Sequence, residues 1–155
     1  IRSRRSVQCY REGAMKKIYA GGFLYNPSTS MVLLHKRDGN TKINPHKWAF
    51  FGGAREPGET PEQTIIREFR EEIGVNVREN ELHALCDYPN PELETHRYIF
   101  YVISDKPKSE MILTEGADFD WISLDSVFSL DLTKRTIQDL NTFTEALRKQ
   151  LIASI

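Results

Sequence analysis

Within residues 52–75, the part with a helical pattern carries four glutamates, Glu62, Glu68, Glu71 and Glu72. On a helix, neighbouring like charges destabilise the structure by roughly 0.2–0.5 kcal/mol per pair, and anions near the C-terminal end also oppose the helix dipole. A cation bound beside the carboxylates would make their clustering favourable. Mg²⁺ and Mn²⁺ prefer carboxylate and carbonyl oxygens, so the crowding indicates a divalent-metal site. The alternative is the solvated face of an amphipathic helix.

The sequence also indicates where such a helix would begin and end. Thr60 can act as the N-cap and form a capping box with Gln63, while Pro61 suits the first helical position. Gly74 is a typical C-terminal stop. We therefore predict a helix over residues 61–73.

The two faces of this helix differ in chemistry. At about 100° per residue, Glu68, Glu71 and Glu72 fall on one side. The neighbouring side is apolar and consists of Ile65, Ile66, Phe69 and Ile73. Arg67 flanks the carboxylates, where it can pair with Glu71 or reach back to Glu59. The segment is thus expected to bury one face and to present acids beside it.

The elements around this helix are mostly strands. Six stretches rich in β-branched and aromatic residues are expected to be strands, over 17–25, 31–36, 47–51, 82–88, 97–103 and 118–124. The first two should form a hairpin. A closing helix is expected over about 133–153, from the three-to-four-residue spacing of Ile137, Leu140, Phe143, Leu147 and Leu151. This order indicates an α+β class or a three-layer α/β/α arrangement.

Length, charge and cysteine content limit the class of protein. The 155 residues suit one domain, and a net charge of -1 gives no overall electrostatic case for a nucleic-acid or membrane-surface partner. Cys9 and Cys86 have no disulfide or zinc-ligand spacing, and no stretch resembles a membrane span, so we expect a cytoplasmic protein. Residues 1–14 are expected to be a disordered tail or an added extension; a basic arm that contacts an anionic ligand is the alternative.

The glutamate segment is also part of a longer pattern. In chain order, this pattern consists of Gly53, Glu59, Arg67, Glu68, Phe69, Glu71, Glu72, Gly74 and Val75. The spacing resembles the complete Nudix box, with every defining position filled. The flanks resemble the MutT-type branch of that family, with a strand pair before the box and "TEGADFDWISL" after it.

The resemblance implies both a fold and a reaction. The fold would be α/β, an α/β/α sandwich around a mixed β-sheet, formed by residues 15–155. The reaction would be hydrolysis of the pyrophosphate bond in a nucleoside diphosphate linked to another group, with Mg²⁺ or Mn²⁺ as cofactor and a small-molecule nucleotide as substrate. Carboxylate-held ions suit this chemistry, because they neutralise phosphate charge and position or deprotonate the attacking water.

By the same resemblance, the residues of the box have roles in the site. The ions would be held by Glu68, Glu71, Glu72 and a backbone carbonyl of Gly52. Glu71 would act as the general base, with a glutamate outside the box as the alternative. Glu59 and Arg67 would be a supporting pair that fixes the preceding loop on the helix.

Residues outside the helix are expected to complete the site. Glu115 is the first choice for a further metal ligand, ahead of Glu110 and Asp118. Arg37 resembles the basic residue that contacts substrate phosphates in MutT-type members, and Gly53 is expected beside the substrate. The aromatic residues that could stack on a nucleobase, or belong to the core instead, are Trp48, Phe50 and Trp121. Of these, Trp48 is assigned to the substrate.

The resemblance leaves the substrate itself open. Chain length and the segment after the box favour a nucleoside triphosphate, hydrolysed to the monophosphate and pyrophosphate. Pro91 has a spacing similar to that in ADP-ribose pyrophosphatases, so an enzyme for ADP-ribose or nucleotide sugars is one alternative. A non-catalytic module that senses a nucleotide is another. Thr133 lies near the position of the base-reading asparagine in the oxidised-guanine enzyme, which argues against oxidised dGTP. The oligomeric state is left open.

Overall fold

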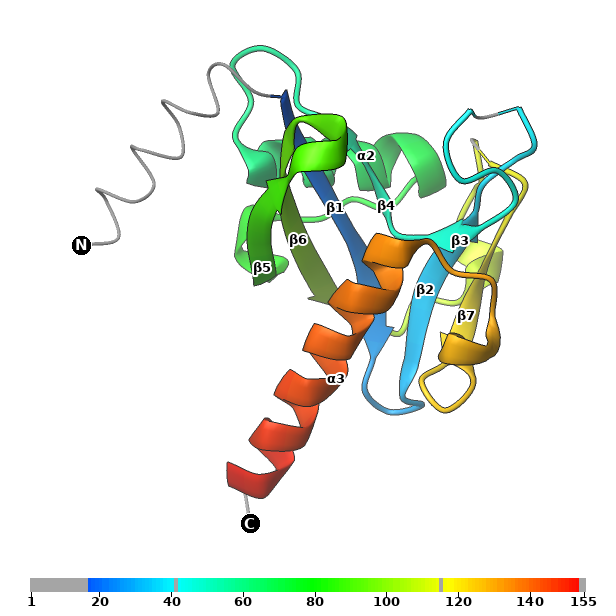
Figure 1. Ribbon diagram of the computed structural model, residues 1–155. Helices are drawn as coiled ribbons and strands as arrows, with labels where there is room; N and C mark the ends of the chain where they lie inside the picture. The colour runs from blue at the N-terminus through cyan, green and yellow to red at the C-terminus, as the bar shows by residue number, and fades with distance from the viewer. Residues whose placement is uncertain (1–16, 41, 115, 154–155) are drawn as a thin grey trace.

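The computed structural model describes residues 17–40, 42–114 and 116–153, so the expected tail at residues 1–14 and the expected ligand Glu115 lie outside the described residues (Figure 1). The strands are β1 (Lys17–Asn26), β2 (Met31–Lys36), β3 (Trp48–Ala49), β4 (Phe51–Ala54), β5 (Leu82–Asn90), β6 (Thr95–Ile103) and β7 (Asp118–Ser123). The helices are α2 (Pro61–Ile73) and α3 (Lys134–Ala153). Neither helix is both long and apolar enough to cross a membrane.

The strands form one mixed sheet. Its main order is β3-β2-β1-β6-β5, with β4 also paired with β1 and β7 with β2. β1 and β6 run parallel, from Lys17 opposite Thr95 to Tyr25 opposite Ile103. The other pairs are antiparallel, including the predicted hairpin of β1 and β2. The α/β class is therefore confirmed.

Each face of the sheet is covered by one helix. Because successive side chains of a strand point to opposite faces, β1 contributes Ala20 and Leu24 to one core and Phe23 and Tyr25 to the other. The first core also contains the apolar face of α2, and the second contains the inner face of α3. Figure 1 shows the two helices on opposite sides of the sheet, which gives the three layers expected from the sequence.

Two strand boundaries differ from the expected ones. The stretch 47–51 forms two strands, because the chain pairs with β2 up to Ala49 and with β1 from Phe51 onward. β5 continues through Pro89 to Asn90. A proline is tolerated there, since β5 lies at the edge of the sheet and the missing N–H breaks no internal ladder.

The closing helix presents a different face to the sheet than the apolar spacing predicts. Leu140 and Phe143 are buried as predicted and Leu147 packs at the margin of the core. Ile137 shares the apolar spacing that predicts the helix, but its side chain is 41% exposed. Asp139 is fully buried instead. The inner face of α3 thus includes a carboxylate, which becomes important for the cleft described below.

Gly22 in β1 leaves no room for a side chain, because an added Cβ would lie 2.5 Å from the backbone oxygen of Phe100 in β6. Gly22→Ala should therefore separate the two central strands and lower the free energy of unfolding by about 1–3 kcal/mol. Denaturant unfolding followed by circular dichroism measures this change. Gly39→Ala is the matched control, since the added Cβ would meet only the movable end of His46. An equal loss of stability in both variants would contradict the explanation.

Candidate active site

The ends of α2 are fixed by its own residues, as the sequence predicts. Thr60 and Gln63 form a reciprocal capping box, with the Thr60 amide donating to Gln63 Oε1 at 2.9 Å and the Gln63 amide to Thr60 Oγ1 at 3.1 Å. Pro61 begins the helix, and Gly74 ends it in the left-handed conformation at φ 68°. Because both ends are defined, the glutamates of the last turns have a fixed position along the helix.

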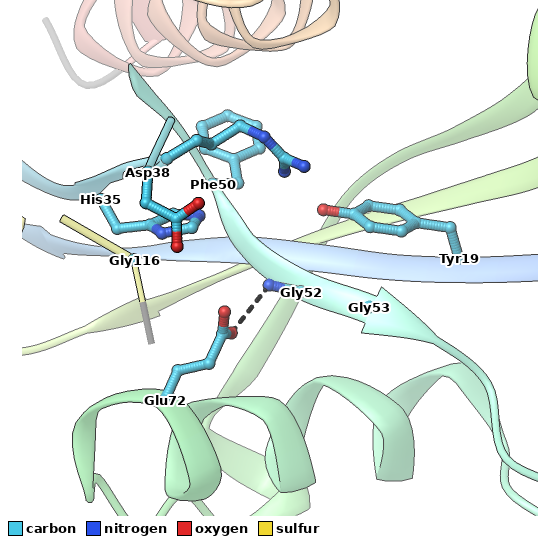
Figure 2. Close-up of a pocket in the computed structure, with 9 residues that line it drawn as sticks. Tyr19, His35, Asp38, Phe50, Gly52, Gly53, Glu72 and Gly116 are labelled. Carbon is cyan, nitrogen blue, oxygen red and sulfur yellow. Dashed lines mark hydrogen bonds between the residues drawn. The ribbon is translucent and has the colours of Figure 1, made fainter. Parts of the chain in front are cut away.

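Two of these glutamates are buried against the paired glycines of β4. Glu68 is 9% exposed and Glu72 is 4% exposed. A Cβ on Gly53 would lie 2.4 Å from Glu68 Oε1, so the glycine leaves room for this carboxylate against β4. The Gly52 amide donates to Glu72 Oε2 at 3.0 Å (Figure 2). Two acids from α2 are thus held at the surface of the sheet.

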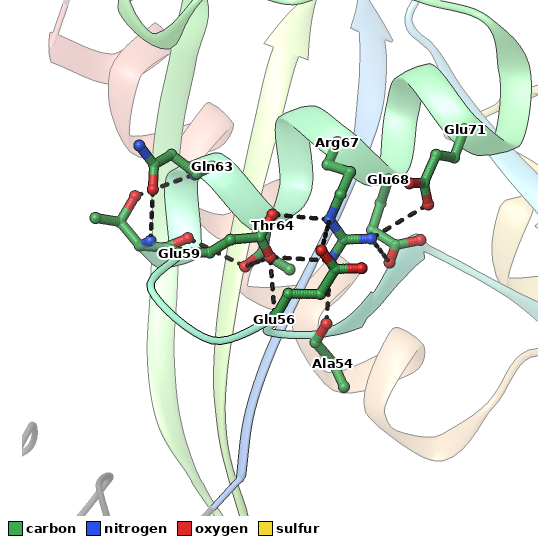
Figure 3. A network of polar contacts seen from close by, with 9 residues as sticks. Ala54, Glu56, Glu59, Gln63, Thr64, Arg67, Glu68 and Glu71 are labelled. Carbon is green, nitrogen blue, oxygen red and sulfur yellow. Dashed lines mark hydrogen bonds and ion pairs between the residues drawn. The ribbon is translucent and has the colours of Figure 1, made fainter.

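Arg67 joins the same acids to the loop before the helix (Figure 3). Its Nε and Nη2 donate to the two oxygens of Glu59 at 2.8 and 3.0 Å, a bidentate pair. Its Nη1 contacts Glu68 Oε1 at 3.0 Å and Glu71 Oε2 at 3.2 Å. Nη2 also donates to the Ala54 carbonyl at 3.2 Å. Both pairings considered from the sequence, with Glu59 and with Glu71, are therefore present together.

The charges of this network affect one another. The hydrogen bonds from Arg67 hold the pKa of Glu59 at about 2, far below the ordinary value. Reciprocally, the hydrogen bonds to Glu59 raise the pKa of Arg67. Both groups are therefore ionised at neutral pH, and the loop that follows β4 is tied to the middle of α2.

The carboxylates of α2 have suitable chemistry for a metal ion but do not converge on one point. Glu68 and Glu71 are bonded to Arg67, while Glu72 is bonded to the Gly52 amide. Among the described residues, no three Asp, Glu, His or Cys side chains are arranged to hold a metal ion. The donors are nevertheless hard oxygen atoms beside a glycine backbone, which fits a divalent cation. Arg67 contacts one oxygen each of Glu68 and Glu71, and each carboxylate has a second oxygen that can bind an ion once the side chains converge.

A cleft opens above Glu72 and the glycines, and we call this part the first lobe. It has a volume of about 300 Å³ and is lined by Tyr19, His35, Arg37, Asp38, Phe50, Gly52, Gly53, Glu72 and Gly116 (Figure 2). Burial and, less strongly, the charge of Arg37 lower the pKa of His35 to about 4. The imidazole is therefore neutral at physiological pH, so the charged side chains of this lobe are Arg37, Asp38 and Glu72.

The cleft continues into a larger second lobe of about 420 Å³. Tyr19, Arg37 and Phe50 line both lobes and mark their junction. The other residues of the second lobe are Ile43, Asn44, Ala49, Asn90, Glu92, Leu93, Thr95, Arg97, Thr133, Lys134, Arg135 and Thr136. The end of the cleft beside the glutamates of α2 is thus acidic, and the far end is rich in basic residues.

The residues expected in the site from the sequence are only partly brought together. Gly53 and Arg37 line the first lobe, and Arg37 is oriented by donating from Nε to the Ile43 carbonyl at 3.2 Å. Trp48 instead packs against the second core and lines neither lobe. Its neighbour Phe50 lines both.

The alternatives weighed from the sequence lie away from the carboxylates. Glu110 is exposed in a short 3-10 turn, and Asp118 Oδ1 pairs with Lys108 at 3.3 Å. Trp121 packs against the first core.

Several lining residues were not found from the sequence. Tyr19 and Arg97 face each other across the parallel pair of β1 and β6, so no local pattern connects them. Asp139 does carry a signal, because it adjoins Leu140 and precedes Phe143 by one helical turn. A polar residue at that spacing on a core-facing helix predicts a buried polar contact.

Comparison with known proteins gives a consistent result. A family model for the NUDIX domain matches residues 15–145. Nucleoside triphosphatase NudI from an Enterobacter species is 30% identical over 114 residues, which cover 67% of this chain and 81% of that protein. The 8-oxo-dGTP diphosphatase of Escherichia coli is 27% identical over 110 residues, covering 71% and 83%. The MutT NUDIX hydrolase from Burkholderia pseudomallei has the same fold, with a TM-score of 0.68 at 20% identity over 81% of this chain and 96% of that one.

Glu59→Gln tests the ion pair with Arg67. The folded-state pKa of Glu59 is about 2, whereas an unfolded glutamate has a pKa of about 4.3. Because the folded value is the lower one, the ionised pair stabilises the fold above about pH 4.3, and this contribution is lost as the pH falls towards 2. The difference in unfolding free energy between the wild type and Glu59→Gln should therefore shrink from about pH 5 to about pH 2.5.

Chemical unfolding at several pH values measures that difference. Asp105→Asn removes an exposed carboxylate on the loop after β6 and controls for the change in net charge. A difference that stays constant over this pH range would contradict the role given to the pair.

Proposed function

The chain belongs to the NUDIX family of hydrolases, and on this basis we propose that it hydrolyses a nucleoside triphosphate to the monophosphate and pyrophosphate, with Mg²⁺ or Mn²⁺ as the ion. The relative with 30% identity is a nucleoside triphosphatase, and the match covers 81% of its length, which supports this substrate class. The substrate would lie along the cleft, with its phosphates in the first lobe and its nucleoside in the second.

The proposal is carried by the excess of acid beside the first lobe, where Glu68 and Glu72 are buried. Arg67 contacts four carboxylates, those of Glu56, Glu59, Glu68 and Glu71, so this group keeps a net negative charge. Glu72 adds another acid nearby. Buried charge is costly unless it is compensated, and a divalent ion shared with substrate phosphates would compensate it. When bound, the ion would neutralise phosphate charge and acidify the attacking water.

Each acid would then have a distinct task. Glu68 and Glu72, fixed at the glycines, would hold the ion together with Glu71, and the Gly52 carbonyl and Glu115 would be the further ligands. Glu71 has the more accessible side chain, at 53% exposed. It can therefore reach a water molecule outside the glycine surface and take up its proton as general base. Arg67 would release Glu71 and keep Glu59, its bidentate partner.

The residues at the junction of the lobes would position the nucleotide. The guanidinium of Arg37 lies between the two lobes, which suits contact with a phosphate of the leaving group or of the nucleotide. Phe50, at the same junction, provides an aromatic wall for the nucleoside. Gly53 lines the same lobe, so its backbone would lie beside the phosphate chain.

Turnover of a substrate panel tests the proposal directly. The panel contains nucleoside triphosphates, ADP-ribose, nucleotide sugars and dinucleoside polyphosphates, each with Mg²⁺ and with Mn²⁺, and phosphorus NMR identifies the products. Release of monophosphate and pyrophosphate from triphosphates, abolished by EDTA and restored by the ion, is the expected result. Preferred cleavage of ADP-ribose or a nucleotide sugar would replace the proposed substrate, and binding without any cleavage would favour a nucleotide-sensing module.

Glu72→Gln tests whether the buried acids hold the ion. The amide keeps an oxygen that can accept from the Gly52 amide, so the fold should be retained. It loses the negative charge, so kcat/KM with Mg²⁺ should fall by at least about 100-fold. Steady-state kinetics and thermal unfolding measure the two effects separately.

Glu62→Gln is the matched control, because it makes the same change on α2 in the first turn, away from the acid cluster. It should leave kcat/KM close to the wild-type value. Wild-type turnover in Glu72→Gln would rule out the proposed metal site.

A further inference from the structure

The wall of the second lobe contains an arginine that is fixed from behind. Arg97 in β6 donates from Nε to Asp139 Oδ2 at 3.1 Å, and Asp139 is the fully buried carboxylate of α3. The Tyr88 hydroxyl donates to the other oxygen of Asp139 at 2.7 Å. The guanidinium of Arg97 also stacks on Tyr19, 4.7 Å from the ring centroid. Contacts from α3 and β1 therefore hold this guanidinium in one orientation, and Tyr88 of β5 in turn holds Asp139.

The ion pair leaves part of the guanidinium available to a ligand. The bond to Asp139 uses Nε, and Arg97 lines the second lobe. The terminal nitrogens of its guanidinium are the donors that a ligand in this lobe can meet. An arginine presents its N–H groups in a planar fork and has no acceptor atom. Because Arg97 is already held in place, little conformational entropy is lost when it binds a ligand. Asp139 does not line the lobe, so it acts by positioning Arg97.

The inner part of the lobe offers more donors than acceptors. Arg135 donates from Nη2 to Asn90 Oδ1 at 2.9 Å, which occupies the acceptor of that buried amide. Arg135 Nε is buried and has no acceptor among the described residues. The hydroxyls of Thr133 and Thr136 are bonded to each other at 2.7 Å. A ligand with acceptor atoms on its outer edge therefore suits this region better than one with donors.

The remaining walls suit a flat ring. Phe50 closes one side at the junction, and Ile43 and Leu93, both about half exposed, lie among the lining residues from two separate loops. Aromatic ligands bind between apolar surfaces of this kind, and a few polar groups fix their orientation. A volume of about 420 Å³ is large enough for a nucleoside.

We propose that the second lobe selects a nucleobase with a carbonyl oxygen on its outer edge, such as hypoxanthine, guanine or uracil, and that Arg97 donates to this oxygen. Adenine and cytosine carry an amino group at the corresponding position. The amino group would face the N–H groups of Arg97. Neither donor would then have a hydrogen-bond acceptor, which is costly in a buried site. The inference rests on the proposed function, because the base belongs to the nucleotide whose phosphates occupy the first lobe.

Two matched pairs of nucleotides compare a carbonyl with an amino group. IMP carries a carbonyl where AMP carries an amino group, and dUMP differs from dCMP in the same way; in each pair the adjacent ring nitrogen also changes, from a donor to an acceptor. Isothermal titration calorimetry with Mg²⁺ measures their affinities without any need for turnover. The carbonyl member of each pair should bind about 10- to 100-fold more tightly, the range typical of one well-placed polar contact. The same preference is expected in kcat/KM for ITP over ATP and for dUTP over dCTP.

Arg97→Lys tests the residue that carries the preference. Lysine keeps a cation beside Asp139, so the fold should be retained, but it lacks the planar fork. The preference should fall to less than about threefold, with AMP affinity little changed. Asp139→Asn should have the same selective effect if it folds, because it removes the group that positions Arg97. Arg148→Gln, on the exposed face of α3, is the control and should keep the wild-type preference.

The outcomes separate this inference from the proposed reaction. Equal or reversed affinity within both wild-type pairs, or no measurable binding of any of the four, would overturn the inference. If Arg97→Lys keeps the wild-type preference, Arg97 is not the residue that selects the base. If the variant binds both nucleotides of a pair equally less tightly, the role of Arg97 is merely structural. If triphosphates are not cleaved but IMP binds better than AMP, the proposed hydrolysis fails and the base selection stands. If triphosphates are cleaved but neither member of a pair is preferred, the base selection fails and the proposed hydrolysis stands.

Discussion

The close approach of α2 to β4 is the constraint on which the site depends. Gly53 allows the carboxylate of Glu68 to occupy space that any side chain on β4 would fill, and the Gly52 amide binds Glu72. The apolar face of α2 packs into the first core and sets the distance between helix and sheet. A side chain at Gly53 would push the Glu68 carboxylate out of its place against β4.

Each end of the cleft holds a charged group in a fixed orientation, and the two ends carry opposite charge. At the first lobe, acids from α2 are held by Arg67 and by a backbone amide. At the second lobe, Arg97 is held by the acid Asp139. In both places a partner on the far side fixes a charged group without consuming all of its hydrogen-bonding capacity. The cleft therefore presents oriented charges of both signs to a ligand that carries phosphates at one end and a base at the other.

The parts of this arrangement that are local in sequence could be predicted, and the non-local parts could not. The bounds of α2 follow from Thr60 and Gly74, and the pairing of Arg67 with Glu71 follows from helical spacing. Glu59 lies in the loop just before the helix, within reach of the long Arg67 side chain. The junction of Tyr19 with Arg97 depends on the register of two parallel strands, which leaves no trace in either segment. The strand break at Phe50 likewise depends on which neighbour each half pairs with.

The parallel pairing of β1 with β6 sets the order in which the cleft can be completed during synthesis. The hairpin of β1 and β2 and the whole of α2 precede β6 in the chain, so the paired glycines and the acids of α2 are synthesised before Arg97 and Asp139. β6 and α3 follow later and bring these two residues. Such long-range parallel contacts form slowly. A nucleotide that spans both lobes can bind only the finished fold. Its binding would therefore shift the equilibrium of the last folding step towards the folded state.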